Sequence, residues 1–297
     1  MKFLAAAIIS TGIAFSASAH ADAPSTAVEG AVKRGEYIFH AAGCGGCHTH
    51  PKAKDKPLAG GHPFKTPYGV FYSPNITPDP KHGIGKWSER DFVKAVRHGV
   101  SPNGKPYFPV FPYTSYARMT ERDAKDLFAY VKTRKAIAEP DKPHDLKWPF
   151  GYRFPLWGWQ LLFFDQGAFK PDPKKSAAWN RGAYLTALGH CAECHSPRNF
   201  LGAIDKEKRF AGTAQAPDGG SVPNITQDKE TGIGKWSAGA ITDLLSSGMM
   251  ADGDFVGGAM ADVIDNTTGK LTKDDLQAMV TYLKSLPPIR HKVSKKN

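Results

Sequence analysis

The chain contains four cysteines, and all four lie in two motifs of identical spacing, Cys44-Gly45-Gly46-Cys47-His48 and Cys191-Ala192-Glu193-Cys194-His195. Cysteines three positions apart share one face of a helix, where they can form thioether bonds to both vinyl groups of one porphyrin. The adjoining histidine can then bind the iron. The motifs therefore predict two covalently bound haems, held by Cys44, Cys47, Cys191 and Cys194, with His48 and His195 as proximal ligands.

Two other kinds of site use paired cysteines. A zinc site built from both pairs would leave the two following histidines unexplained, and it would join two halves that each look complete. A redox disulfide within each motif, as in thioredoxin-like proteins, would need an alternation of strands and helices that the sequence lacks. Haem attachment explains the cysteines and the histidines together.

An internal repeat divides the chain into two parts. Asn75-Ile76-Thr77 and Gly83-Ile84-Gly85-Lys86-Trp87-Ser88 recur 149 residues later, as Asn224-Ile225-Thr226 and Gly232-Ile233-Gly234-Lys235-Trp236-Ser237. Arg34-Gly35-x-Tyr37 recurs after 147 residues, and Thr120-x-x-Asp123 recurs after 152. Offsets that drift by a few residues indicate duplicated domains with altered loops. We expect domain 1 at 22–138, a Pro- and Trp-rich linker at 139–178 and domain 2 at 179–290.

Each part of the repeat has the pattern of helices separated by long loops. Helix signals occur at 34–42 and 120–132, and again at 181–188 and 272–286, where two prolines follow. Frequent Gly and Pro between them predict loops wrapped around something other than a large protein core, and a haem would supply that apolar mass. The expected fold class is all-α. We interpret the apolar stretch Trp157 to Phe164 as inter-domain packing, with a role at a membrane surface as the alternative.

A sixth ligand is expected on each iron, and methionine is common because its soft sulfur favours the reduced metal. In domain 2 the expected ligand is Met260, while Met249 and Met250 are competitors that a core would equally use. The repeat places Phe111 at the position of Met260, and phenylalanine cannot bind iron. Domain 1 therefore leaves several possibilities: Met119, which aligns with an apolar residue before a helix cap, a histidine such as His98, or an iron with an open position.

Other candidate residues have weaker signals. His50, His62 and His82 lie in polar loops and are most simply exposed side chains. Trp87 and Trp236 occupy identical positions in the repeat, where each could donate its indole N–H to a haem propionate or pack as an ordinary core residue.

The N-terminal residues have the pattern of an export signal. Lys2, an apolar run over 3–15 and a small-residue stretch ending at Ala21 predict a signal peptide at 1–21, which places the mature chain in the periplasm. No other apolar stretch is long enough to cross a bilayer, so no transmembrane anchor is expected in the mature chain. The basic tail at 291–297 is expected to be disordered.

Charge is spread unevenly along the chain. Residues 22–138 hold 18 Lys plus Arg against 10 Asp plus Glu, a balance of +8, while residues 179–297 hold 14 against 13, a balance of +1. A basic first half could steer an acidic protein partner. Nucleic acid is not an expected partner, because the chain has no recognisable nucleic-acid motif.

These residues resemble the di- and trihaem cytochrome c subunits of bacterial periplasmic dehydrogenases, such as those of quinoprotein alcohol dehydrogenases and molybdenum hydroxylases. The likeness covers nearly the whole mature chain, and is carried by the segments 181–184, 189–199 and 111–116 and by the Pro-Asn-Ile-Thr loops. It implies two tandem cytochrome c domains, each with helices and loops around one covalent haem. It also implies electron transfer from a dehydrogenase to a quinone, an oxidase or another cytochrome. Some members carry Met at the position of Phe111.

Two functions follow from these observations. The first is an electron carrier with no substrate and no catalytic residues of its own, in which the protein tunes each haem. The alternative is a peroxidase-like dihaem enzyme with an open iron in domain 1, a possibility that Phe111 raises. An acid–base pair for such chemistry is not evident, because His98 aligns with Ser247.

Overall fold

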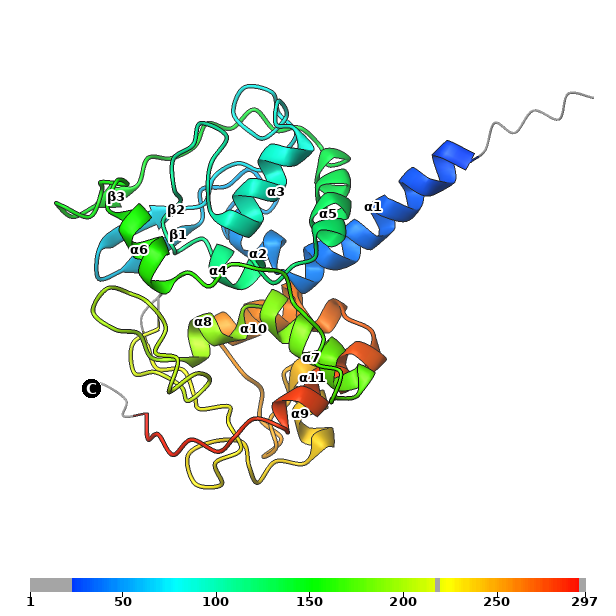
Figure 1. Ribbon diagram of the computed structural model, residues 1–297, viewed down its shortest axis with the longest axis vertical. Helices are drawn as coiled ribbons and strands as arrows, with labels where there is room; N and C mark the ends of the chain where they lie inside the picture. The colour runs from blue at the N-terminus through cyan, green and yellow to red at the C-terminus, as the bar shows by residue number, and fades with distance from the viewer. Residues whose placement is uncertain (1–22, 217–219, 294–297) are drawn as a thin grey trace, which may run out of the picture.

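The computed structural model describes residues 23–216 and 220–293. The expected signal peptide at 1–21 lies outside this range, as do residues 294–297 of the tail. Figure 1 shows two halves, one containing the chain up to α6 and the other the chain from α7 onward. Within the described residues, no helix combines the length and the apolar character needed to cross a membrane.

The described elements are mostly helical. In the first half the helices are α1 (Ala23–Ala41), α2 (Cys44–His48), α3 (Glu89–His98), α4 (Tyr113–Tyr116), α5 (Glu121–Lys132) and α6 (Leu156–Phe163). In the second half they are α7 (Ala177–Leu188), α8 (Cys191–His195), α9 (Ala238–Ser247), α10 (Ala259–Asn266), the 3-10 turn η1 (Thr268–Lys270) and α11 (Lys273–Leu283). All four stretches with helix signals are helical over most of their length, although α11 ends at Leu283 and not at residue 286.

The structure also contains a small β-sheet, which the prediction of helices and loops alone did not include. Strands β1 (Pro63–Thr66), β2 (Gly69–Tyr72) and β3 (Asp145–Leu146) form a small antiparallel sheet in the order β1-β2-β3. Thr66 pairs with Gly69, so a two-residue turn joins the first two strands. Val70, Phe71 and Tyr72 favour extended backbone. The strands are only two to four residues long and lie among frequent Gly and Pro, so the sequence pattern did not predict them.

The Gly of the repeated Arg-Gly-x-Tyr motif allows two helices to cross closely. A Cβ added to Gly35 in α1 would clash with the backbone carbonyl of Asp126 in α5. A Cβ added to Gly182 in α7 would clash in the same way with the carbonyl of Ala278 in α11. Neither contact involves a flexible side chain that could move aside. The same helix pair therefore forms the centre of each half.

Replacing Gly35 with alanine should destabilise the protein by about 2–3 kcal/mol, because α1 and α5 must separate to accept the methyl group. Gly30→Ala is the matched control on the same helix, since the nearest atom to its Cβ would be the flexible Arg34 Nη1 at 3.3 Å. It should be neutral or slightly stabilising. Urea unfolding of the holoprotein, followed by circular dichroism, measures both. Equal stability of the two variants would contradict the close crossing.

The two halves contact each other through reciprocal hydrogen bonds made by repeated residues. The Tyr37 hydroxyl of α1 donates to Asp275 of α11, and the Tyr184 hydroxyl of α7 donates to Asp123 of α5. Each tyrosine oxygen also accepts a backbone N–H from the opposite half, of Thr272 and of Thr120, both at 3.2 Å. Burial tends to raise the pKa of Asp275, but hydrogen bonds from Arg181 and Tyr37 keep it below its ordinary value. An approximate two-fold axis therefore relates the two halves.

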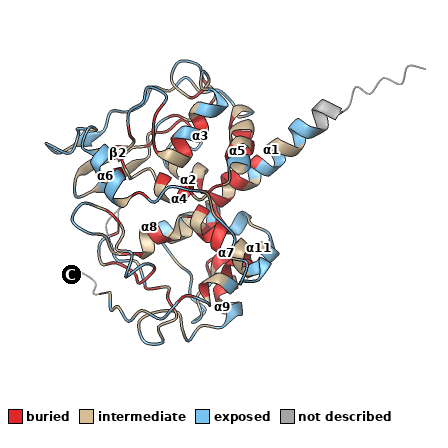
Figure 2. Ribbon diagram, viewed as in Figure 1, coloured by how far each residue is buried: buried red, intermediate tan, exposed pale blue. Residues whose placement is uncertain are grey.

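Each half has its own hydrophobic core, and the two cores interlock. The first core includes Tyr184 and Leu188 from α7, while the second includes Ala41 from α1. Figure 2 shows buried residues concentrated where α1, α5 and α7 meet. The interface between the halves is therefore continuous with both cores.

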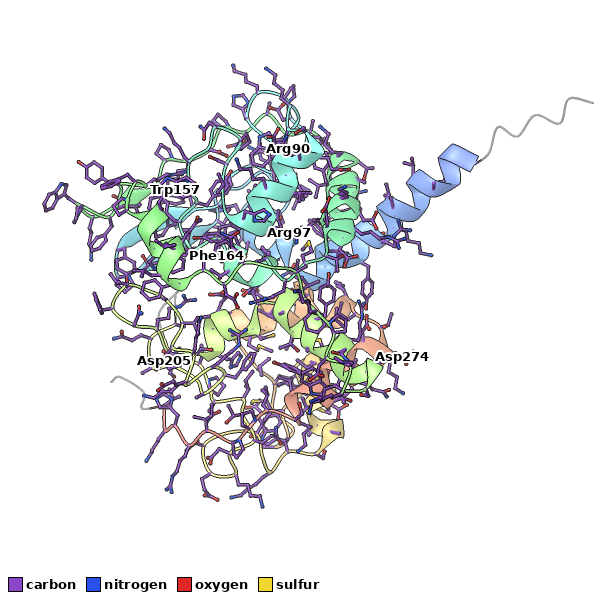
Figure 3. All side chains as sticks on the ribbon, in the orientation of Figure 1. Arg90, Arg97, Trp157, Phe164, Asp205 and Asp274 are labelled. Atoms are coloured by element: carbon purple, nitrogen blue, oxygen red, sulfur yellow. The ribbon has the colours of Figure 1, made fainter. Side chains whose placement is uncertain are left out.

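The stretch interpreted as inter-domain packing forms α6 and fits that interpretation only in part. Phe164, which follows α6, packs against Tyr113 of the first half with ring centroids 5.1 Å apart, and the Trp159 indole donates to the Leu201 carbonyl of the second half at 2.9 Å. Trp157 and Leu161 remain 49% and 86% exposed. Figure 3 shows Trp157 at the outer edge and Phe164 further inside. One face of α6 is therefore open to solvent.

The beginning of the expected disordered tail is attached to the second half. The His291 backbone N–H donates to Thr231 Oγ1 at 3.1 Å, and the His291 ring hydrogen-bonds to the Ala211 carbonyl at 2.9 Å. The expectation of disorder was wrong at this residue, because charge and polarity do not reveal such specific hydrogen bonds.

Candidate functional site

His48 and His195 are the last residues of α2 and α8, and the same hydrogen bond holds each of them. His48 Nδ1 lies 2.9 Å from the Pro74 carbonyl oxygen, and His195 Nδ1 lies 2.8 Å from that of Pro223. Because a carbonyl only accepts, Nδ1 must carry the proton, and Nε2 keeps its lone pair. Burial lowers the pKa of both histidines. Each is therefore a neutral imidazole prepared to bind a metal through Nε2.

Pro74 and Pro223 were not among the predicted site residues, although each directly precedes a repeated Asn-Ile-Thr. The repeated asparagine holds this loop in place. Asn75 accepts the Thr77 backbone N–H at 2.9 Å and donates to the Ile137 carbonyl at 2.8 Å. Asn224 makes the equivalent bonds in the second half, at 2.8 Å each. Proline at a constant offset of 149 in both halves was the signal available.

The two cysteine motifs form one-turn helices that face the boundary between the halves. Burial raises the pKa of the Cys44 and Cys191 thiols to about 12. It raises that of Cys47 to about 11, and the neighbouring Cys194 adds to this rise. Thiols with such pKa values are protonated at neutral pH, unlike the low-pKa cysteines of thioredoxin-like redox centres. The described cysteines form no disulfide.

Among the partly buried apolar residues packed against each core, four occupy equivalent positions in the two halves, and we call each set of four a rim. The first rim consists of Cys44, Ile76, Trp87 and Phe111, and the second rim consists of Cys191, Ile225, Trp236 and Met260. Three of the four positions carry the same residue type in both rims. A partly open apolar border, next to a neutral histidine and two thiols, fits a flat apolar cofactor such as haem. Trp87 and Trp236 pack against the cores, and their contact with propionates stays a prediction.

The methionines occupy different environments. Met260 is the second residue of α10 and is half-buried at the second rim. Met119 is fully buried inside the first core, at 0% exposure, directly before Thr120, the N-cap of α5. Met249 is 37% exposed, and Met250 follows it in the turn after α9. Of these residues, Met260 alone belongs to a rim.

The remaining loop histidines are held by local contacts. The His82 ring lies 3.3 Å from Asp79, His50 Nδ1 accepts the Lys52 N–H at 3.1 Å, and His62 stacks on Phe64 at 4.7 Å. Among the described residues, no three His, Cys, Asp or Glu side chains gather in a way that could hold a metal ion.

Glu193, in the middle of the second motif, is a buried carboxylate that was not among the predicted site residues. It forms an ion pair with Arg198 at 2.6 Å and accepts hydrogen bonds from the Thr114 and Ser115 hydroxyls, both at 2.8 Å. Burial tends to raise its pKa, but Arg198 and the hydroxyls keep it below the ordinary value. Glu193 therefore places a negative charge between the second motif and α4 of the first half. Glycine occupies the equivalent position, Gly46.

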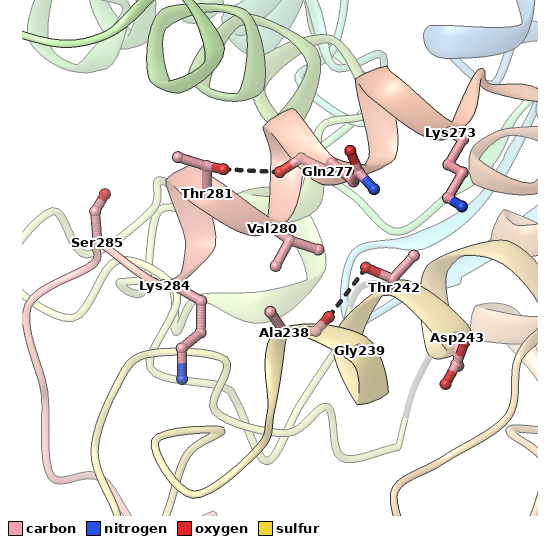
Figure 4. A pocket seen from close by; sticks show the side chains of 10 residues that line it. All are labelled: Ala238, Gly239, Thr242, Asp243, Lys273, Gln277, Val280, Thr281, Lys284 and Ser285. Carbon is pink, nitrogen blue, oxygen red and sulfur yellow. Dashed lines mark hydrogen bonds between the residues drawn. The ribbon is translucent and has the colours of Figure 1, made fainter.

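A surface hollow between α9 and α11 is separate from these features. It is lined by residues such as Ala238, Thr242, Gln277 and Lys284 (Figure 4). No predicted site residue lines this hollow.

A mostly helical fold that presents Cys-x-x-Cys-His with a neutral histidine and an apolar rim defines a c-type cytochrome. Comparison with known proteins agrees, since the cytochrome c family profile matches residues 32–135. The chain is 44% identical over 269 residues to a "Diheme cytochrome c-type" protein of Cereibacter sphaeroides, covering 88% of this chain and 87% of that protein. The chain belongs to the cytochrome c family, whose members carry electrons on covalently bound haem.

Other relatives are subunits of dehydrogenases. The chain is 39% identical over 267 residues to the cytochrome c subunit of a quinone-dependent alcohol dehydrogenase from Gluconacetobacter polyoxogenes. It is 39% identical over 264 residues to the gluconate 2-dehydrogenase cytochrome c subunit of Pantoea cypripedii. These alignments cover 87% and 86% of this chain but only 56% and 59% of the relatives. The chain is thus an electron carrier, related to electron-transfer subunits of dehydrogenases.

Proposed function

We propose that this protein is a periplasmic dihaem cytochrome c, with one haem in domain 1 (22–138) and one in domain 2 (179–290). It takes single electrons from a dehydrogenase and passes them to a quinone, an oxidase or another cytochrome. Bound haem supplies an iron that alternates between the ferric and ferrous states. The relatives named as dehydrogenase subunits support the donor, and the signal pattern at 1–21 supports the location.

The residues of the chain have distinct roles in this proposal. The four motif cysteines would hold the two porphyrins. Nε2 of His48 would bind the iron in domain 1, and Nε2 of His195 would bind the iron in domain 2. The Pro74 and Pro223 carbonyls keep the proton on Nδ1, which fixes the tautomer and raises the basicity of the ligand nitrogen. Met260 would supply a sulfur ligand to the iron in domain 2.

The observation that carries the proposal is the presence of two matched rims whose motifs face each other. Cys47 lies close enough to Cys194 for the charge of one thiolate to affect the pKa of the other. The first motif also contacts the second half, since a Cβ on Gly46 would lie 3.5 Å from Asn266. Figure 1 shows α2 and α8 on either side of the boundary. Haems held by these two motifs would therefore lie within one folded unit.

A reductive titration of the purified holoprotein, followed by visible absorbance, tests this function. We expect two one-electron steps per chain, and rapid reduction by a partner dehydrogenase supplied with its substrate. The peroxidase-like alternative requires catalytic turnover of hydrogen peroxide with an electron donor. Such turnover, or uptake of a single electron per chain, would contradict the proposal.

Glu193→Gln should raise the potential of the second haem. Removing a buried negative charge makes the ferric state less favourable, on the order of 1 kcal/mol or tens of millivolts. Spectroelectrochemistry measures the shift, and Glu207→Gln, in the same half but without a buried ion pair, is the control. A potential equal to that of the wild type would show that Glu193 only supports the fold.

A further inference from the structure

The loops that follow α3 and α9 have the same backbone structure. The Tyr107 N–H donates to the Gly99 carbonyl at 2.7 Å, and the Val256 N–H donates to the Gly248 carbonyl at 3.0 Å. An isolated antiparallel bridge closes each loop, Val100 with Pro106 and Met249 with Phe255. Phe111 and Met260 each come five residues after the second bridge residue. Phe111 therefore occupies the place in the first half that Met260 occupies in the second.

The side chain of Phe111 lies among aromatic rings. Its ring centroid is 5.6 Å from that of Tyr107, 6.2 Å from that of Tyr113 and 5.8 Å from that of Tyr116. The Tyr116 hydroxyl donates to the Ala42 carbonyl at 2.6 Å, so this bond occupies its proton. This part of the first rim is lined by aromatic rings, with the buried Tyr113 hydroxyl as a polar group beside them, and it presents no sulfur.

Met119 does not supply the sulfur that the first rim lacks. It is the one methionine between residues 22 and 138, but it is enclosed in the first core at 0% exposure, whereas Met260 is half-buried at a rim. Its backbone N–H donates to the Tyr116 carbonyl at 2.9 Å, and the N-cap Thr120 follows directly. The Met119 side chain is enclosed among the residues of the first core, beneath the start of α5.

We propose that the iron in domain 1 has no protein ligand on its distal side, and that its open position beside Phe111 binds small uncharged diatomic molecules of the carbon monoxide and nitric oxide type. The inference rests on haem attachment at Cys44 and Cys47, as proposed above. The class of ligand follows from the surroundings, because an aromatic wall favours neutral molecules over anions. The second iron, with Met260, stays closed to them.

Carbon monoxide difference spectra of the reduced protein test the proposal. We expect one carbon monoxide bound per chain, half of the haem content, measured in the same sample. Phe111→Met should reduce this binding at least tenfold, and should double the weak near-infrared sulfur-to-iron band of the oxidised protein. Val110→Met adds a sulfur one residue away and should change neither quantity. Met119→Leu should also leave both unchanged, which keeps the test valid if Phe111→Met fails to fold.

The outcomes separate this inference from the proposed function. A full content of two haems with no carbon monoxide bound would overturn the inference alone, and Met119→Leu and His98→Ala would then identify the ligand by restoring binding. Two carbon monoxide molecules per chain would also overturn it, because the site beside Phe111 would not differ from that beside Met260. Protein without haem would instead overturn the proposed function.

Discussion

Replacing Cys191 and Cys194 together with alanine should produce a chain that carries half the haem of the wild type. Without thiols, α8 cannot form the thioether bonds, and His195 alone cannot retain a porphyrin through purification. The second rim would then expose Ile225, Trp236 and Met260, so the second half should also lose stability. Haem per chain is measured by absorbance of the denatured, reduced pyridine complex.

The matched variant is the double replacement of Cys44 and Cys47. It should also retain half the haem, but the remaining haem should show the near-infrared sulfur-to-iron band, because Met260 is intact. The domain 2 variant should lack that band. Wild-type haem content in either double variant would show that its motif is not an attachment site.

Met260→Ala should have the second-largest effect. Loss of the soft sulfur should lower the potential of the second haem by on the order of 100 mV, a small part of the roughly 0.8 V that axial ligands span. The near-infrared band should disappear, and carbon monoxide should bind two haems per chain instead of one. Spectroelectrochemistry and carbon monoxide titration measure these changes.

Met249→Ala is the control for Met260, because Met249 is more exposed and lies outside both rims. It should leave the band and the potential unchanged. A band that persists in Met260→Ala and disappears in Met249→Ala would show that Met249, and not Met260, supplies the distal sulfur.

The helical part of the fold was predictable because its signals are local. Thr120 and Thr272 cap α5 and α11 as their spacing to Asp123 and Asp275 indicates, with Oγ1 to N–H distances of 3.1 and 3.3 Å. The small sheet and the attachment of His291 were missed, because both depend on partners distant in the sequence. The helical pattern of the Trp157 to Phe164 segment was likewise read only as packing.

The candidate site also contains residues that the sequence predicts and residues that it does not. Cysteine spacing is a direct consequence of porphyrin geometry, so the sequence alone places the motifs. The carbonyls of Pro74 and Pro223 carry no side-chain signal, since any residue supplies a carbonyl, and the loop structure selects them. Glu193 looks like an ordinary surface residue between two cysteines, and its burial depends on Thr114 and Ser115, 79 and 78 residues away.

The central claim is that both motifs hold a covalent haem, and the intact mass of the purified holoprotein tests it most directly. Produced in a host that attaches haem during export, the chain beginning at Asp22 should be heavier than its bare polypeptide by two haem masses, and denaturation should not release them. A mass equal to the polypeptide, or to the polypeptide plus one haem, would contradict the account.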